Sequence, residues 1–133
     1  DFYGIAEIAP RVLPDSAVVL SRKPRNFYSA SGLQGQNYPL FPEPDSFFNT
    51  ARGTGARYVL FDGIDALAQA YVAPVLMSRS NSFCIMFGLG QDRATLFGIR
   101  PVMTAPPATP NFELCGPEFW RSAAIRDSVL NAN

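Results

Sequence analysis

Three short apolar runs, separated by segments of helical periodicity, limit the possible folds of this chain more than any other feature. The runs are Ala17–Leu20, Arg57–Phe61 and Ser82–Gly88. Nearly continuous apolar strands are typical of a sheet that is covered on both faces. Alternation of strands with helices is typical of a parallel sheet. The sequence therefore predicts one α/β domain with three layers and a mainly parallel sheet.

The other elements follow from apolar spacing and from proline and glycine positions. A second strand is expected over Gln36–Phe41. Two strands, Ser82–Gly88 and Ala94–Ile99, surround the turn Gly90–Arg93 and predict a C-terminal antiparallel hairpin. Helices are expected over Phe2–Val12, Pro24–Ser31, Ser46–Arg52 with Asp45 as the N-cap, and Asp65–Ser78 with a kink at Pro74.

The character of the chain changes after Arg100. Four prolines between Pro101 and Pro110 predict an extended segment, and a short helix is expected over Pro117–Leu130. We therefore divide the chain into an α/β domain (1–100) and a proline-rich extension whose terminal helix packs on it (101–133). Phe119 and Trp120 either dock on a partner or fold back on the domain.

Composition excludes several functional classes. The 133 residues include 11 basic and 11 acidic side chains, which argues against a nucleic-acid binder that relies on bulk charge. Histidine is absent, so histidine-based nucleophile activation and most zinc catalysis are excluded. The longest apolar stretch, Ala66–Met77, is too short to span a bilayer. We expect no metal and no cofactor.

A cationic turn follows the first predicted strand. It contains Arg22, Lys23 and Arg25. Ligands of open α/β sheets bind outside the carboxyl ends of strands, and an arginine offers a planar fork for a phosphate or carboxylate. These three residues are therefore candidate ligand-binding residues. The alternative is a solvated turn whose cations pair with acidic side chains.

Aromatic and acidic side chains add further candidates. Tyr28 and Tyr38 could stack on a sugar ring with their hydroxyls in water, or they could close the core. Asp62 and Asp65 could act in acid–base chemistry or bind a cation. Their position at a helix start favours helix capping instead.

Cys84 and Cys115 are the only cysteines, and no CxxC spacing suggests a metal site. The two could pair in an extracytoplasmic domain, and closing that loop would contribute about 3–4 kcal/mol. The alternative is two unpaired thiols.

Several segments, taken in order, resemble the soluble C-terminal domain of polytopic membrane glycosyltransferases. That superfamily uses lipid-phosphate-linked sugars and includes protein O-mannosyltransferases and aminoarabinose transferases. The resemblance covers about residues 2–100 and is carried by Leu13–Pro24, Phe27–Gly32, Tyr38-Pro39, Gly55–Asp62 and Tyr71–Leu76.

The resemblance implies an extracytoplasmic (periplasmic) domain of a membrane protein that transfers a sugar from a polyprenyl-phosphate donor. The family's catalytic carboxylates lie near its N-terminal membrane helices, so no catalytic residue transfers to this chain. The expected role is a non-catalytic accessory domain that shapes the acceptor side. Its expected partners are the membrane-embedded portion of the same polypeptide and a lipid-linked sugar, glycan or protein acceptor, with no nucleic acid. The alternative is a stand-alone module that binds a small ligand or glycan.

Overall fold

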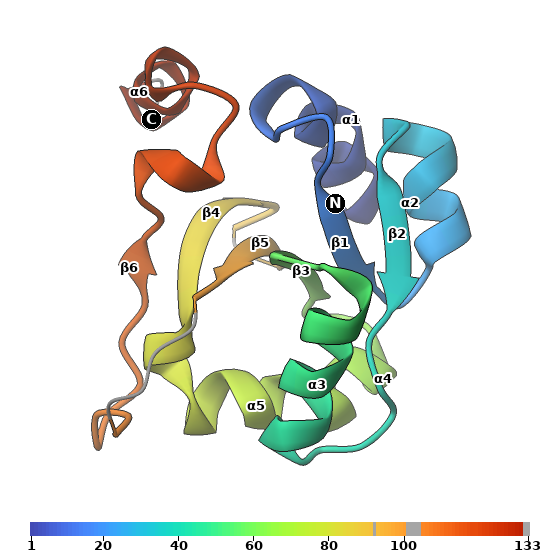
Figure 1. Cartoon of the computed structure of the whole chain (residues 1–133), viewed down its shortest axis with the longest axis vertical. Helices are drawn as coiled ribbons and strands as arrows, with labels where there is room; N and C mark the ends of the chain where they lie inside the picture. Colours follow the sequence, from blue (N-terminus) through green and yellow to red (C-terminus); the bar gives the residue numbers. More distant parts are fainter. Residues whose placement is uncertain (92, 101–104, 132–133) are drawn as a thin grey trace.

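A computed structural model describes residues 1–91, 93–100 and 105–131 (Figure 1). Its helices are α1 (Phe2–Val12), α2 (Pro24–Ser31), α3 (Pro44–Thr54), α4 (Ala66–Tyr71), α5 (Ala73–Ser78) and α6 (Ala123–Asn131), with 3-10 turns η1 (Ser80–Ser82) and η2 (Pro117–Phe119). Its strands are β1 (Val18–Ser21), β2 (Gln34–Asn37), β3 (Tyr58–Asp62), β4 (Phe83–Leu89), β5 (Ala94–Ile99) and β6 (Glu113–Leu114).

The described strands form one sheet in the order β2-β1-β3-β5-β4-β6. β1 is parallel to both β2 and β3, and β4 is parallel to β6. β5 is antiparallel to β4 and also to β3, between which it lies. The predicted α/β class and the C-terminal hairpin are confirmed. The sheet order further shows that the second strand of the hairpin, not the first, joins the parallel half.

Helices cover both faces of the sheet, so the molecule has three layers (Figure 1). On one face α1 and α2 pack against Val19 and Tyr58, and on the other α3 and α5 pack against Leu20 and Val59. Neighbouring residues of a strand enter opposite cores because side chains alternate across a sheet. This explains why the central strands β1 and β3 are apolar at nearly every position.

Several details differ from the sequence prediction. Asp45 is not the N-cap of α3, because the helix begins at Pro44, two residues before the predicted Ser46, and Glu43 takes the cap position. The helix predicted over Asp65–Ser78 is two helices, because α5 begins at Ala73 with Pro74 in its first turn. β2 runs over Gln34–Asn37 rather than the predicted Gln36–Phe41.

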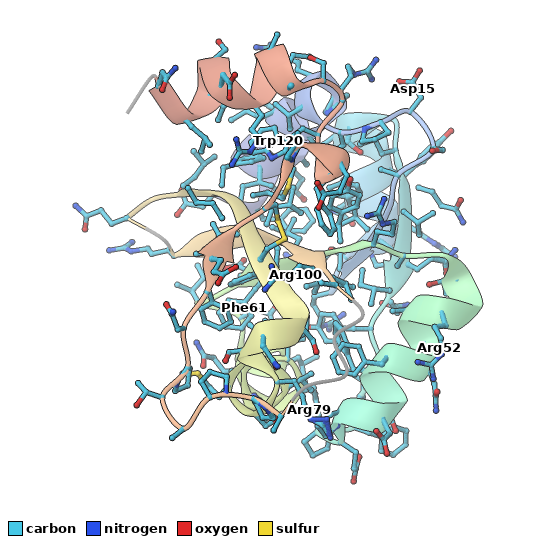
Figure 2. All side chains as sticks on the ribbon, turned by 60° about the vertical axis from the view of Figure 1, so that its left-hand side comes forward. Asp15, Arg52, Phe61, Arg79, Arg100 and Trp120 are labelled. Carbon is cyan, nitrogen blue, oxygen red and sulfur yellow. A yellow bond between two sulfur atoms is a disulfide. The ribbon has the colours of Figure 1, made fainter. Side chains whose placement is uncertain are left out.

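The C-terminal segment belongs to the same domain. β6 extends the sheet beside β4, and Phe119 and Trp120 are buried in the core that faces α1. These two side chains therefore fold back on the domain, which is one of the two alternatives that the sequence left open. A disulfide joins Cys84 on β4 to Cys115 beyond β6 (Figure 2).

Part of the extended segment predicted over Pro101–Pro110 falls on residues 101–104, which lie outside the described residues. Residues 105–112 form no helix or strand. The helix predicted over Pro117–Leu130 is divided into η2 and α6 at Trp120, whose backbone is extended. In the described segments no helix combines the length and apolar character needed to cross a bilayer.

Candidate functional site

The carboxyl ends of β1 and β3 form the topological switch point of the parallel half-sheet. From β1 the chain passes through α2 to β2 at the edge, then through α3 to β3 on the other side of β1. α2 and α3 cover opposite faces. Ligands of α/β sheets bind at such points. Arg22 follows β1 here, and Asp62 ends β3.

Tyr38 lies beneath this edge, and its ring cannot stack on a sugar as one reading of the sequence required. Its side chain is only 3% exposed and packs in the core with α3. Burial, and after it the charges of Asp65 and Asp62, raises the pKa of its hydroxyl to about 12, while the charge of Arg22 acts in the opposite direction. These charges therefore lie close to Tyr38. The hydroxyl is buried without a hydrogen-bond partner among the described residues.

The two aspartates at this edge of the sheet, Asp62 and Asp65, accept hydrogen bonds from backbone amides. Asp65 accepts hydrogen bonds from the backbone amides of Leu67 and Ala68, at 2.8 and 3.2 Å, and so caps α4. Asp62 accepts a bond of 3.2 Å from the amide of Ile64 and shapes the preceding turn. Helix capping, the reading that the sequence favoured, accounts for the position of Asp65.

A second region, the outer surface of α2, brings Arg25 and Tyr28 together. Both side chains are exposed, and 61% of Tyr28 is open to solvent. Residues 25 and 29 lie one turn apart on a helix, so Arg25 and Ser29 form a ridge along its exposed side. No acidic side chain pairs with Arg25 in the part of the chain that the structure describes.

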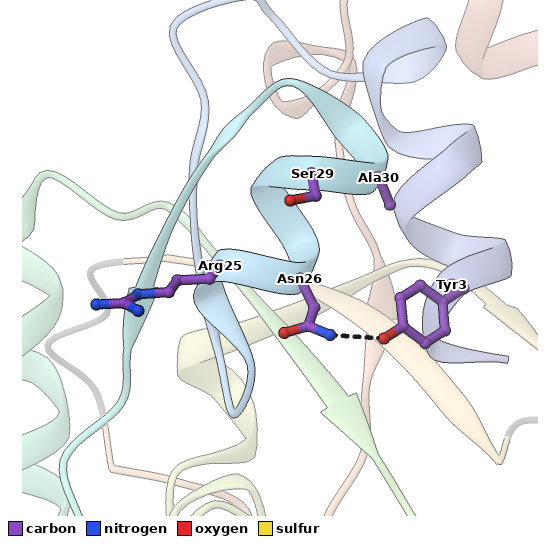
Figure 3. Close-up of a pocket in the computed structure, with 5 residues that line it drawn as sticks. All are labelled: Tyr3, Arg25, Asn26, Ser29 and Ala30. Carbon is purple, nitrogen blue, oxygen red and sulfur yellow. Dashed lines mark hydrogen bonds between the residues drawn. The ribbon is translucent and has the colours of Figure 1, made fainter.

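A hollow lies on each side of this ridge. One, of about 330 Å³, lies between α2 and β2 and is lined by Pro24, Arg25, Tyr28, Ser29, Gln34 and Gly35. The other, also about 330 Å³, lies between α2 and α1 and is lined by Tyr3, Arg25, Asn26, Ser29 and Ala30 (Figure 3). Each volume is at the lower end of the range for small-molecule sites.

Local contacts fix the shape of both hollows. The Asn26 side-chain amide donates a 2.7 Å hydrogen bond to the Tyr3 hydroxyl, and the Tyr3 ring stands edge-on to Phe2. On the other side, a side chain at Gly35 would lie 2.6 Å from the Pro24 carbonyl. β2 therefore passes directly under the start of α2. The Tyr3 ring is held in place with 48% of its surface exposed.

The end of α2 is fixed equally tightly. Gly32 adopts a left-handed conformation with φ of 76°, which favours glycine, and stops the helix. The Ser31 hydroxyl donates to the Phe27 carbonyl and accepts from the Leu33 amide. These bonds turn the chain directly from α2 into β2. A rigid connection therefore joins the two walls of the hollow between α2 and β2.

The first turn of α2 carries positive charge at the positive end of the helix dipole. Lys23 takes the N-cap position, Arg25 follows Pro24, and no acidic residue lies in that turn. Cations at a helix N-terminus are unfavourable by a few tenths to 1 kcal/mol. This arrangement does not favour stability of the free domain, but it does favour an anion near α2.

The structure thus divides the predicted ligand-binding residues. Arg25 and Tyr28 lie on α2, Arg22 lies by the buried Tyr38 at the strand ends, and exposed Lys23 lies between them. The sequence patterns did not single out Tyr3, Asn26 and Gln34. The one available signal was an aromatic residue, Tyr3, at helical spacing from the charged Glu7 and Arg11.

Among the described residues, no group of three or more histidine, cysteine, aspartate or glutamate side chains is placed to hold a metal ion. Comparisons of the chain with protein-family models, with curated proteins and with solved structures find no match. The assignment of a function therefore rests on the residues and their geometry.

Proposed function

We propose that this chain is a non-catalytic extracytoplasmic accessory domain of a membrane glycosyltransferase that transfers a sugar from a polyprenyl-phosphate donor. In this role the domain shapes the acceptor side of an active site located elsewhere in the same polypeptide. The family resemblance of the ordered segments suggests the transferase, and the geometry of those segments supports the accessory role.

The observation that carries the proposal is where the resembling segments lie. Leu13–Pro24 contains β1 and the cationic turn, Phe27–Gly32 lies within and just after α2, and Gly55–Asp62 contains β3. These three segments therefore border one edge of the parallel half-sheet and the adjoining surface of α2, whereas Tyr71–Leu76 lies in α4 and α5.

Two further observations support the proposal. The buried cysteines are joined in a disulfide, and disulfides persist mainly in oxidising compartments outside the cytoplasm. The carboxylates at the strand ends cap a helix and a turn, so they are already engaged in structural contacts. The disulfide fits an extracytoplasmic location, and the engaged carboxylates fit a domain that binds rather than catalyses.

The test uses the complete product of the gene in membranes. We expect it to consume a polyprenyl-phosphate sugar, and we expect the double variant Arg22→Ala/Arg25→Ala to raise the acceptor KM without abolishing turnover. The isolated 133-residue chain should show no turnover. A complete product that resides in the cytoplasm with reduced cysteines, or that consumes no lipid-linked sugar, would contradict the proposal.

The second candidate function is a stand-alone binding module for a small ligand or glycan. The two hollows beside Arg25 favour it, because they are complete within this chain. A complete gene product that has no membrane-spanning segments and binds glycan as tightly as the 133-residue chain would select this candidate.

A further inference from the structure

Two exposed tyrosine rings, Tyr28 on α2 and Tyr3 on the adjoining α1, lie on opposite sides of Arg25, which has no ion-pair partner among the described residues. Successive residues of a helix are rotated by about 100°, so Asn26 and Ala30 face α1, Tyr28 faces β2, and Arg25 and Ser29 lie between. Figure 3 shows the Arg25 side chain extending away from the hydrogen-bonded Tyr3–Asn26 pair. Arg25 and Ser29 line both hollows.

The chemistry of the two linings is that of a carbohydrate site. Tyrosine rings present flat apolar faces to the C–H groups of a sugar, and the amides of Asn26 and Gln34 and the hydroxyl of Ser29 offer donors and acceptors to its hydroxyls. Neither hollow is lined by a large aliphatic side chain. A purely apolar ligand would gain little here.

The charge of the surface selects an anionic ligand. Neither lining includes an acidic side chain, and Arg25 forms no ion pair within the described residues. The helix dipole and the exposed Lys23 add positive potential at the start of α2. A carboxylate or phosphate on the ridge would bind the guanidinium through two parallel hydrogen bonds.

The spacing of the hollows sets the ligand length. An α-helix with its side chains is about 10–12 Å across. A single sugar ring in one hollow therefore cannot also reach the ring of the other. Only a ligand of several sugar units crosses the ridge and contacts both Tyr3 and Tyr28.

We propose that the outer surface of α2 binds an anionic oligosaccharide, with Arg25 and Ser29 at the centre and Tyr3 and Tyr28 each beneath a sugar ring. This inference deepens the proposed function, because it names the chemical class of the acceptor or lipid-linked glycan that the domain would hold. It adds Tyr3, Asn26 and Gln34 to the residues predicted from sequence.

Calorimetric titration of the 133-residue chain with galacturonic acid and with its dimer and tetramer tests the inference. We expect the tetramer to bind at least tenfold more tightly than the monomer, and a neutral malto-oligosaccharide of equal length to bind at least tenfold more weakly than the tetramer. Arg25→Ala should weaken tetramer binding at least tenfold. Arg52→Ala, an exposed arginine change on α3 across the sheet, should leave binding unchanged.

The aromatic variants separate the two hollows. Tyr3→Ala and Tyr28→Ala should each reduce the gain from monomer to tetramer, whereas Tyr3→Phe should retain most of it because the ring remains. Circular dichroism checks that each variant is folded. Equal binding of monomer and tetramer, binding insensitive to Arg25→Ala, or no binding of any galacturonate would overturn the inference.

The outcomes for the inference and for the proposed function are distinguishable. If the complete gene product consumes lipid-linked sugar but the chain binds no galacturonate, the inference fails alone. If the chain binds the tetramer as predicted but the complete product consumes no lipid-linked sugar, the proposed transferase role fails and the α2 site stands.

Discussion

Two buried tyrosines, Tyr38 and Tyr58, differ in whether the side-chain hydroxyl forms a hydrogen bond. The Tyr58 hydroxyl donates a hydrogen bond to the backbone carbonyl of Phe119, which ties β3 to the C-terminal segment. The Tyr38 hydroxyl has no partner among the described residues. A buried polar group without a partner costs about 1–3 kcal/mol, whereas a satisfied one contributes about 1 kcal/mol.

Matched phenylalanine substitutions therefore have opposite effects. Tyr58→Phe should lower the free energy of unfolding by about 1–2 kcal/mol, because the Phe119 carbonyl loses its donor. Tyr38→Phe should raise it by about 1 kcal/mol. Urea unfolding measures both. A Tyr38→Phe variant that is destabilised as much as Tyr58→Phe would show that the Tyr38 hydroxyl is satisfied.

The same two hydroxyls predict how stability depends on alkaline pH. Burial raises the pKa of each from 10.0 to about 12. The unfolded chain loses these protons near pH 10 and the folded chain only near pH 12. The stability that they contribute is therefore complete below pH 10 and is lost as the pH rises towards 12.

Unfolding measured from pH 9 to 12 should show this fall in stability, and the double variant Tyr38→Phe/Tyr58→Phe should flatten it. These two hydroxyls should cause no loss of stability below pH 10. An equally steep decline in the double variant would contradict the assignment.

Among the helices, α2 has an unfavourable distribution of charge along its axis. Its first turn has cations where the dipole favours anions. Arg25→Glu should consequently raise the free energy of unfolding by about 0.5–1 kcal/mol at low salt, while it removes the anion-binding group.

The matched control lies at the opposite end of another helix. Arg52 is in the last turn of α3, where a cation is favourable, so Arg52→Glu should lower stability by a similar amount. Denaturant unfolding at two salt concentrations measures both effects. A loss of stability in Arg25→Glu would mean that Arg25 has a structural role that the described contacts do not show.

The described elements also indicate which features a sequence can predict. Three elements have the predicted bounds: Phe2–Val12, Pro24–Ser31 and Ala94–Ile99. Neighbouring residues set these bounds, as Gly32 does at the end of α2. The burial of Tyr38 was not predictable, because it depends on packing against α3. The role of Tyr3 depends on α1 lying beside α2, which local patterns do not encode.

At the scale of the whole molecule, the disulfide and the C-terminal segment close one core. Cys84 and Cys115 are both buried, and a side chain at Gly98 would lie 2.8 Å from both sulfurs. Arg121 donates to the Val12 and Pro10 carbonyls and contacts Asp15, so the segment also reaches the end of α1.

Removing the disulfide should loosen this segment without altering the α2 surface. Cys84→Ala/Cys115→Ala should lower the free energy of unfolding by about 3–4 kcal/mol, because the closed loop constrains the unfolded chain. Trp120 is the single tryptophan and is 4% exposed, so its fluorescence should shift to longer wavelength as the segment opens. Unchanged emission and stability would show that the disulfide is dispensable for the fold.

Amide chemical-shift mapping of the labelled chain with tetragalacturonate shows whether the surface of α2 binds a sugar ligand. We predict that the largest shifts fall on Tyr3, Arg25, Asn26, Tyr28 and Gln34, on both sides of α2. Shifts confined to the strand ends around Arg22 and Asp62, or no shifts at saturating ligand, would rule out a sugar site on α2.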